Sequence, residues 1–376
     1  MKFIVSSTEL LSHLLLVGRV ISNKNNNMPI LDNFLFRLAG NELNITASDL
    51  ETTLDTVITI DQVDEEGAIA VPAKLLTESL RDFAEQPLTF IANTTTHSIE
   101  ISWAGGKFNI PGSLAEDYPA KPALKDITAT LLLPANTLLD AINCTLYATA
   151  DDELRPMMNG IYFDIGEEST SFVASDAHKL VDYTRKDVKA DKVATFILSK
   201  KPANLLKNIL GKITESVKVE LDSKNAVFTL PNYSLICRLI EGTYPAYRSV
   251  IPTDNSRLVT VDRVDLLNCV RRVSVFSNQA SNLIKLKIAE NELTVSAQDL
   301  DFSVSAYERL NCQYTGEDLE IGFKSTFLCD ILNNLTSVNV LLKLADASRA
   351  GLILPVEKGN ENEEILTLLM PMMIGA

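Results

Sequence analysis

The chain has 376 residues, 46% of them hydrophobic, and a formal net charge of −15 at pH 7. That is enough apolar material for three domain-sized cores. No apolar run reaches the roughly 18 residues that a membrane-spanning helix needs, and the negative charge taken alone argues against a nucleic-acid-binding protein.

The chain begins with a predicted strand, and polar residues follow within a few positions, so the N-terminus does not resemble a signal peptide. The cysteines are odd in number and form no Cys-x-x-Cys pair, which is typical of reduced thiols in a cytosolic protein. They are Cys144, Cys237, Cys269, Cys312 and Cys329. We therefore expect a cytoplasmic protein.

Along the chain, a strand that leads directly into an amphipathic helix is predicted six times. Apolar residues at i, i+3 and i+4 mark the helices, as at Leu10, Leu14 and Val17. In chain order the steps are Lys2–Val5 into Glu9–Val20, Ala68–Pro72 into Lys74–Phe83, Thr130–Leu133 into Asn136–Ala148, Ala194–Leu198 into Lys201–Leu210, Leu258–Val261 into Val264–Phe276, and Leu319–Phe323 into Ser325–Leu335. Further strands are predicted at Asn33–Leu38, Gly160–Ile165 and Leu283–Ile288.

A short pattern that ends on an aspartate occurs once in each third of the chain, at Asp49, Asp176 and Asp299. Its spacings of 127 and 123 residues are those of a domain, because solenoid units repeat every 20–50 residues or so. The sequence therefore predicts an α+β chain of three repeated domains: 1–124, 125–252 and 253–376. The linkers are expected at Pro119–Asp126 and Pro252–Ser256. Because the aspartates recur at one repeat position, we interpret them as turn-forming residues.

Catalytic patterns are sparse. The three histidines share no metal-ligand spacing. His13 lies on an apolar helix face and is expected to pack, and His97 is expected at a hairpin tip. Gly105-Gly106 precedes a strand and is typical of a hairpin turn, and there is no phosphate-binding loop. We expect no enzyme activity, no cofactor and no metal.

The charge is unevenly distributed. The six predicted helices carry a net charge of +4, which leaves −19 on the rest of the chain. Chance and solvated surfaces are one explanation. The other is that the helices line a channel through a ring. Helix axes pack about 8–10 Å apart, so six helices leave only about 9 Å clear, whereas twelve leave about 28 Å. A DNA duplex about 20 Å wide would need twelve helices, and therefore two chains.

Several stretches resemble the bacterial sliding clamps, the beta subunits of DNA polymerase III. They occur in order through all three predicted domains: Thr46–Glu51, Leu154–Gly160, Ala174–Leu180, Glu241–Arg248, Glu320–Phe323 and Met370–Met372. The resemblance implies a head-to-tail homodimeric ring, with two helices per domain lining a channel and antiparallel sheets outside. It also implies a processivity factor without catalysis that encircles duplex DNA, independently of sequence, and tethers the replicative polymerase. A separate loader would open the ring.

The resemblance implies a groove between the second and third domains for short linear motifs of polymerases, the clamp loader and repair proteins. Three features depart from the family pattern. Ala177 and Lys179 replace the usual Gly and Arg, Ser249 replaces a frequent basic residue, and the chain ends on Met373–Ala376. The groove is therefore expected to be more apolar and less basic. The positions implied are Met158, Ser175, Ala177, His178, Lys179, Leu180, Pro245, Ser249, Val250, Phe327, Leu368, Leu369, Met370, Pro371, Met372 and Met373. For Leu368 and Leu369 a core role is the alternative.

Two more surfaces are expected. Basic residues at the predicted channel are Lys24, Lys74, Arg81, Arg155, Lys200, Lys201, Lys207, Arg271, Arg272 and Lys324. The family-matched dimer surfaces are Phe108 and Ile110 on the first domain, and Val275 and Phe276 on the third.

Two alternatives remain open at this point. One is a peptide-binding scaffold that uses the same repeat without acting in replication. The other is an enzyme with a dispersed site, which the lack of a convergent His, Cys and Asp cluster disfavours.

Overall fold

The computed structural model describes residues 1–21, 28–190 and 192–374. Lys24, one of the expected DNA-contacting residues, lies outside the described residues. All six predicted helices are present: α1 Ser7–Val17, α2 Ala73–Leu80, α3 Ala135–Thr145, α4 Lys200–Leu210, α5 Arg263–Ser274 and α6 Ser325–Asn334. Most end a few residues earlier than predicted, and after α1 and α3 the chain continues into 3-10 turns at Gly18–Val20 and Leu146–Ala148.

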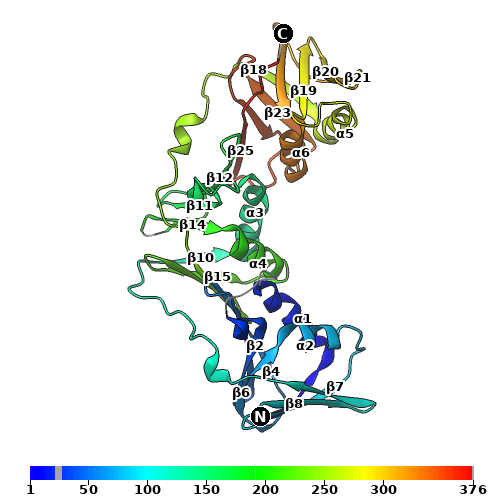
Figure 1. Ribbon diagram of the computed structural model, residues 1–376. Helices are drawn as coiled ribbons and strands as arrows, with labels where there is room; N and C mark the ends of the chain where they lie inside the picture. The colour runs from blue at the N-terminus through cyan, green and yellow to red at the C-terminus, as the bar shows by residue number, and fades with distance from the viewer. Residues whose placement is uncertain (22–27, 191, 375–376) are drawn as a thin grey trace. The chain divides into compact units, whose positions relative to one another are not determined.

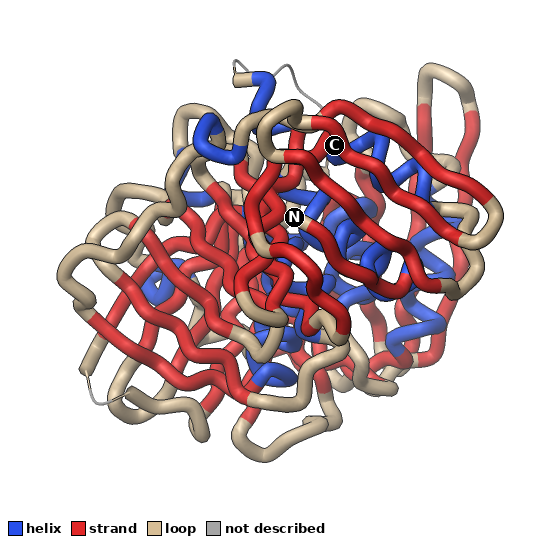
Figure 2. The backbone as a smooth tube through the Cα atoms, turned by 90° about the horizontal axis from the view of Figure 1, so that it is seen from below, coloured by secondary structure: helices blue, strands red, loops and turns tan. Residues whose placement is uncertain are grey.

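The described strands include every strand that the sequence predicted, and strand is the commonest regular structure (Figure 2). In the first third they are β1 Lys2–Ser6, β2 Asn33–Ala39, β3 Glu42–Ser48, β4 Thr52–Thr59, β5 Gln62–Glu65, β6 Gly67–Pro72, β7 Pro87–Asn93, β8 Ser98–Trp103 and β9 Gly106–Pro111. In the second they are β10 Ala129–Pro134, β11 Gly160–Ile165, β12 Thr170–Ser175, β13 Lys179–Arg185, β14 Ala194–Ser199, β15 Ser216–Leu221, β16 Asn225–Thr229 and β17 Tyr233–Arg238. In the last they are β18 Arg257–Asp262, β19 Leu283–Ala289, β20 Glu292–Asp299, β21 Val304–Asn311, β22 Leu319–Lys324, β23 Asn339–Leu344, β24 Gly351–Pro355 and β25 Glu363–Leu369.

These elements repeat one motif six times: a strand, a helix and three antiparallel strands (Figure 1). The copies begin at β1, β6, β10, β14, β18 and β22, and β5 is an additional short strand in the first copy. Two copies follow one another in each predicted domain. The three sequence repeats marked by the aspartates therefore have the same order of helices and strands.

The chain folds into two compact units. Unit 1 comprises residues 1–139 and 201–239, and unit 2 comprises 140–200 and 240–376. In unit 1 the sheets have the orders β5-β1-β7-β8-β9 and β10-β15-β16-β17-β4-β3-β2-β6. In unit 2 the orders are β14-β11-β12-β13-β25-β24-β23-β18 and β21-β20-β19-β22.

Each eight-stranded sheet contains a junction between two predicted domains. In unit 1, β4 of the first domain pairs with β17 of the second, and in unit 2, β13 of the second pairs with β25 of the third. Each time, the fourth strand of one domain meets the last strand of the next. The equivalent strands β21 and β9 are left at the edges of the two smaller sheets.

The helices bury one apolar face against the sheets. In α1 the buried side chains include Leu10, Leu14 and Val17, and in α4 they include Leu206 and Ile209. This is the spacing that predicted the helices from the sequence, and each fully buried aliphatic side chain stabilises the fold by roughly 1.5–3 kcal/mol. No helix in the described part of the chain is long and apolar enough to cross a membrane.

The turn role of the recurring aspartates is confirmed. The Asp49 carboxylate accepts hydrogen bonds from the backbone N–H groups of Glu51 and Thr52. Asp176 accepts from the N–H groups of His178 and Lys179, and Asp299 accepts from that of Asp301. Such side-chain-to-backbone bonds are how aspartate stabilises a turn.

The predictions for His13, His97 and the Gly105-Gly106 turn are also confirmed. The His13 ring stacks on Tyr233 and hydrogen-bonds Thr56, and burial lowers its pKa. His97 follows β7 in a tight turn and has a positive φ of 54°. The chain reverses between β8 and β9 at the two glycines.

Candidate peptide groove and nucleic-acid interface

The residues expected at the partner groove all lie in unit 2 and gather around the β13–β25 junction. Leu180 on β13 lies directly opposite Leu368 on β25. Beyond β25, the Met370 N–H donates to the His178 carbonyl at 2.8 Å, and the Met372 N–H donates to the Gly322 carbonyl at 2.8 Å. The terminal segment is thus held by backbone hydrogen bonds to the turn before β13 and to β22.

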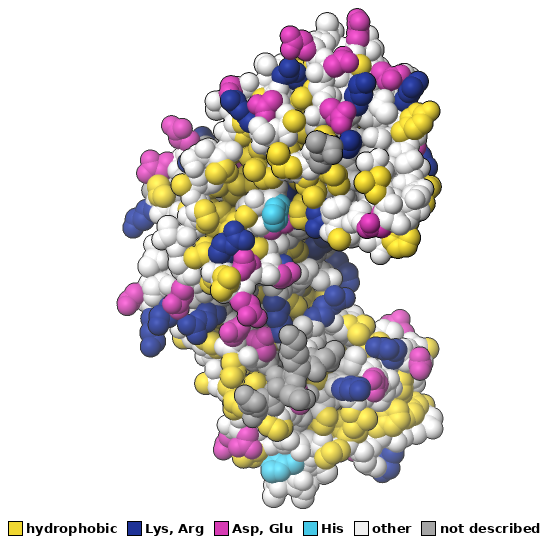
Figure 3. All heavy atoms as spheres, turned by 45° about the horizontal axis from the view of Figure 1, so that its top comes forward, with side chains coloured by type: hydrophobic (Ala, Val, Ile, Leu, Met, Phe, Trp, Pro, Cys, Tyr) yellow, Lys and Arg dark blue, Asp and Glu magenta, His cyan; other side chains and the backbone are white. Residues whose placement is uncertain are grey.

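The floor of this region is apolar and its rim is exposed. Leu180 and Leu368 are buried in one cluster with Tyr244, Tyr247 and Leu352. Val250, Met370 and Met373 are respectively 58%, 43% and 83% exposed. Figure 3 shows hydrophobic side chains gathered beside a histidine on one face of the molecule. Exposed apolar side chains next to a packed floor are what a peptide-binding groove offers.

One groove position is corrected by this geometry. Successive side chains of a strand point to opposite faces, and Leu369 packs fully buried in the cluster formed with α5 and α6. Leu369 is therefore a core residue and not an anchor surface. Leu368 is also buried, but in the cluster that includes Leu180.

Cationic side chains converge on the Phe327 ring at the start of α6. The Lys179 and Lys324 ammonium groups lie 4.3 and 4.7 Å from its centroid, and the His178 ring stacks on it at 5.7 Å. Lys179 is buried and pairs with the Asp176 carboxylate at 2.6 Å. Asp330 lies near this pair, and burial raises the pKa of its carboxyl while Lys179 opposes that rise. Lys324, expected at the DNA, is therefore placed beside the groove residues.

The remaining groove residues occupy the surrounding segments. Met158 is buried in the short 3-10 turn before β11, and the Ser175 hydroxyl donates to the Lys179 carbonyl. Pro245, Ser249 and Val250 lie in the segment after β17, where Tyr244 and Tyr247 are the buried residues. Pro371 is half-buried in the terminal segment.

Ala177 stands at an unusual backbone position. Its φ is 72°, in the left-handed region that favours glycine. The equivalent residue in the first domain, Leu50, has a φ of 76°. Both residues directly follow the turn aspartate. Because alanine stands at position 177 where the family usually has glycine, the backbone of the groove is strained there.

Several residues expected at DNA already have partners within the protein. Lys200 pairs with Asp151, Lys201 with Asp49, Arg155 with Asp152, and Arg272 with Glu308. Arg271 donates to Asn333 at 2.8 Å. Lys74 and Arg81 on and after α2, and Lys207 on α4, are exposed. Modest, partly satisfied charges suit a contact that holds DNA weakly.

The expected dimer residues lie on or near elements that include the edge strand β9 and the helix α5, which contacts the edge strand β21. Phe108 and Ile110 are on β9, where Phe108 packs against Phe83 and Trp103 and Ile110 is buried. Val275 and Phe276 follow α5 and are 77% and 39% exposed.

Sequence reasoning missed the polar residues on the same face as the groove. Tyr247 donates to the Asp164 carboxylate at 3.1 Å, and Arg248 donates to it at 2.9 Å. Tyr244 stacks on Tyr162 with ring centroids 4.6 Å apart, and burial raises the pKa of Tyr244. The repeated Tyr-Pro-Ala motif was the available signal, because Tyr118 of the first motif likewise contacts the strand that leads to its turn aspartate.

Three family models match the chain in succession. They describe the N-terminal, central and C-terminal domains of the DNA polymerase III beta subunit, at residues 1–122, 132–246 and 248–373. The chain belongs to the DNA polymerase III beta subunit family.

Curated relatives and solved structures agree with this assignment. The chain is 28% identical over 377 residues to the "Beta sliding clamp" of Haemophilus influenzae, which it matches over 100% of both chains. It is 29% identical to that of Synechococcus elongatus over 92% of both. The crystal structure of a DnaN sliding clamp from Bartonella birtlesii bound to griselimycin matches with a TM-score of 0.92 and 30% identity, covering 100% of both chains. The resemblance seen in the sequence, the α+β fold and the repeated clamp architecture are thereby confirmed.

Proposed function

We infer that this chain is a DNA sliding clamp of replication, a ring that travels on duplex DNA and tethers the replicative polymerase. The observation that carries this inference is the succession of three beta-subunit domains over residues 1–122, 132–246 and 248–373. We propose that the clamp catalyses no reaction itself, acts in the cytoplasm, and needs no cofactor. Among the described residues, no group of three His, Cys, Asp or Glu side chains is placed to hold a metal.

The unpaired strands support a head-to-tail homodimer. Within the chain, the fourth strand of a domain joins the last strand of the next at β4–β17 and β13–β25. The same rule applied to the third domain would join β21 to β9 of a second copy. Both strands are sheet edges, and an unpaired edge is a ready template for another strand. A heterologous contact of this kind closes into a ring when the rotation fits.

We propose three domains, 1–124, 125–252 and 253–376, and a partner groove at the β13–β25 junction. The groove would take short motifs from the polymerase, the clamp loader and repair proteins. Met370, Met372 and Val250 are the proposed contacts for the apolar anchors. Flexible methionine side chains repack around different partners, which suits a site shared by several proteins.

The test of the clamp is topological. The purified protein, loaded by a cognate clamp loader, should remain on nicked circular DNA through gel filtration and should be lost when the same DNA is linearised. Equal retention on both forms would indicate ordinary DNA affinity instead of a ring. A peptide-binding scaffold that does not act in replication, the second candidate, would be retained on neither form.

The proposed DNA contacts are individually weak, so their removal should have a modest effect. Replacing Lys24, Lys200 and Lys201 by Ala should reduce loading on circular DNA a few-fold, and the loss should vary with salt because phosphate contacts release counterions. The dimer should be unaffected, as sedimentation would show. Normal loading of the triple variant across a salt series would contradict the proposed channel.

A further inference from the structure

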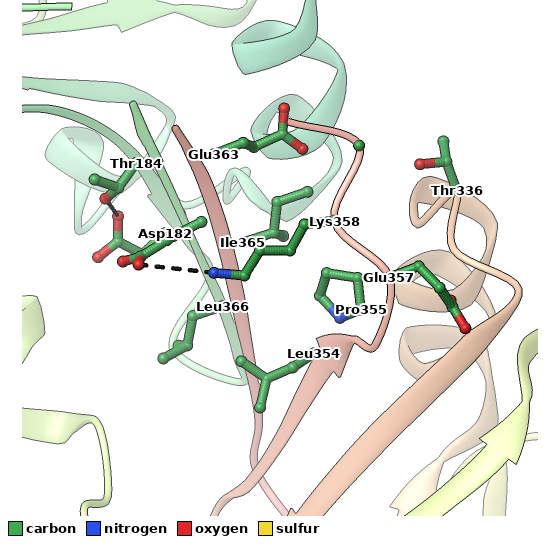
Figure 4. A pocket seen from close by; sticks show the side chains of 12 residues that line it. Asp182, Thr184, Thr336, Leu354, Pro355, Glu357, Lys358, Glu363, Ile365 and Leu366 are labelled. Carbon is green, nitrogen blue, oxygen red and sulfur yellow. Dashed lines mark hydrogen bonds and ion pairs between the residues drawn. The ribbon is translucent and has the colours of Figure 1, made fainter. Parts of the chain in front are cut away.

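A pocket lies next to the groove, on the same face of the eight-stranded sheet of unit 2 (Figure 4). It has a volume of about 310 Å³ and is formed by β13, the end of β24 and β25. Leu180 and Asp182 share one face of β13, opposite Leu368 and Leu366 on β25. The pocket therefore continues the floor of the groove along the same two strands.

The floor between groove and pocket is apolar. Leu354 and Leu366 pack against the cluster that contains Leu180 and Leu368, and Pro355 completes this side of the pocket. Asp182 lies two positions from Leu180 along β13, and Glu364 lies four positions from Leu368 along β25, which is about 7 and about 13 Å along a strand. An extended peptide in the groove would reach the pocket with about two to four residues.

The polar side of the pocket is acidic. Asp182, Glu357, Glu363 and Glu364 line it, with Lys358 as the only cation among the lining residues of this described pocket. Lys358 lies 3.9 Å from Glu364, which Lys186 also contacts at 2.5 Å. Asp182 accepts a hydrogen bond from Thr184 at 3.0 Å, and no ion pair of Asp182 is present within the described residues. Burial raises the pKa of the Asp182 carboxyl, since the fold supplies too little positive charge to offset it.

The internal repeat offers a comparison, because the equivalent carboxylate of the first domain has a cation of its own. Asp55 on β4 stands six residues after Asp49, as Asp182 stands six residues after Asp176. Asp55 is only 4% exposed, accepts a hydrogen bond from Thr46 at 2.6 Å, and pairs with Lys121 just after the first Tyr-Pro-Ala turn. The first domain therefore supplies its own ammonium group to the buried carboxylate.

In the second domain that cation is directed elsewhere. Arg248 follows the second Tyr-Pro-Ala turn, but its guanidinium group bonds Asp164. The position of Asp164 on β11 corresponds to Arg37 on β2, because each lies opposite the equivalent residue of the next strand. With an aspartate in place of an arginine on β11, the Arg248 guanidinium pairs with Asp164, and no direct ion pair forms with Asp182 among the described residues. The charge of Arg248 still lowers the pKa of Asp182, but burial outweighs it.

We propose that this pocket binds a lysine or arginine side chain of a partner peptide whose apolar anchors occupy the groove. The aliphatic stem would lie on Leu354, Leu366 and Pro355, and the charged head would meet Asp182. This inference rests on the proposed partner groove and adds a preference to it: partners of this clamp carry a basic residue about two to four positions from their anchors.

Fluorescence polarisation with synthetic peptides tests the proposal on the full-length protein. The reference peptide carries a Gln-Leu-x-Leu-Phe motif with Gly-Ser flanks. Test peptides place one Lys at one, two, four or six residues from the motif, on either side. We expect binding about fivefold tighter for Lys at the second or fourth position of one flank, as a partly desolvated ion pair would give. Equal affinity at all positions and on both sides would overturn the proposal.

Variants separate the pocket from the general attraction of an acidic protein for basic peptides. Asp182→Asn should abolish the preference for Lys without changing affinity for the reference peptide. Asp318→Asn removes the same charge at an exposed site of unit 2 and should keep the preference. Lys358→Gln should strengthen it, because the competing cation is removed. A preference that survives Asp182→Asn would contradict the proposal.

Binding of the reference peptide tests the proposed groove separately from the proposed pocket. If it binds the wild type and loses affinity when Met370 and Met372 are replaced by Ala, the groove stands, and a missing Lys preference refutes the pocket alone. If those replacements leave its binding unchanged, the groove assignment itself is wrong. A Lys peptide with both Leu anchors replaced by Ala should not bind, since the proposal requires the groove to be filled.

Discussion

The junctions β4–β17 in unit 1 and β13–β25 in unit 2 have the same topology but different surfaces. At the end of β17 the Arg238 N–H donates to the Glu51 carbonyl, and just after β25 the Met370 N–H donates to the His178 carbonyl in the equivalent place. The backbone is the same at both positions. At the second junction, however, the side chains are those of a histidine and a methionine instead of two charged residues.

The two junctions also differ in how their carboxylates are neutralised. Asp55 is buried and pairs with Lys121, whereas Asp182 faces a pocket and has no ion pair among the described residues. Tyr118 packs against Leu31, Leu35 and Ala70 of its own domain. From these contrasts we infer that the first junction is a structural joint, and that the second became a binding surface by side-chain replacement on an unchanged sheet.

The largest expected effect concerns the proposed junction between β21 of one chain and β9 of a second copy. Replacing Val275 and Phe276 by Ala should convert the proposed dimer into monomers and abolish retention on circular DNA. These exposed apolar side chains would lose their partner surface, and such anchors dominate interface energies. Analytical ultracentrifugation at several concentrations measures the change. Val338→Ala, an exposed control in unit 2, should remain dimeric; a stable dimer of the double variant at low concentration would refute the interface.

The next effect belongs to the groove at the β13–β25 junction. Replacing Met370 and Met372 by Ala should weaken peptide binding about 30-fold or more, because desolvated anchors are each worth about 2 kcal/mol and 1.4 kcal/mol is tenfold. Met28→Ala changes an equally exposed methionine of unit 1 and should have no effect. Size-exclusion chromatography should show that the dimer survives. Loss of both peptide binding and the dimer would mean that the terminal segment is mainly structural.

The two aspartates should respond oppositely to neutralisation. Asp55→Asn should destabilise the protein by about 1–3 kcal/mol, because it removes a charge-assisted hydrogen bond and leaves the half-exposed Lys121 unpaired. Asp182→Asn should be neutral or stabilising at pH 7, because burial raises the pKa of Asp182 and so disfavours its charged form in the fold. Urea unfolding of each variant at pH 7 measures both changes.

The pH dependence follows from the sign of that shift. A carboxyl whose pKa is raised by folding binds its proton more tightly in the native state, so its contribution to stability falls as pH rises through the raised pKa. The advantage of Asp182→Asn should therefore be greatest at neutral pH and should disappear below the ordinary aspartate pKa of 3.8. An advantage that grew on acidification would show that the charge is not the cause.

The smallest effect tests the strained turns that the junctions share. Ala177→Gly should stabilise the protein by up to about 1 kcal/mol, because glycine adopts the left-handed region freely, although its greater freedom in the unfolded chain offsets part of the gain. Leu50→Gly should act similarly in unit 1. Thermal unfolding of both single variants measures the shifts. Destabilisation at both sites would show that the side chains contribute more than the backbone strain costs.

The elements and the repeat were predictable because they depend on local pattern. Each helix has an apolar face, and each turn aspartate bonds the backbone within three residues. The position of Lys179 over Phe327 was not predictable, since it depends on how the start of α6 meets the β13 turn. The acidic pocket was hidden for a similar reason: Asp182 and Glu357 are 175 residues apart and meet only because β13 pairs with β25. The opposite facing of Leu368 and Leu369 required the strand register.

Hydrogen–deuterium exchange with and without the reference peptide tests most directly whether the second junction alone binds partners. We expect slower exchange at residues 176–182, 245–251 and 366–373 on peptide binding. The equivalent segments of the first junction, 49–55, 118–124 and 235–239, should exchange at unchanged rates. Equal protection at both junctions, or protection confined to unit 1, would contradict the account.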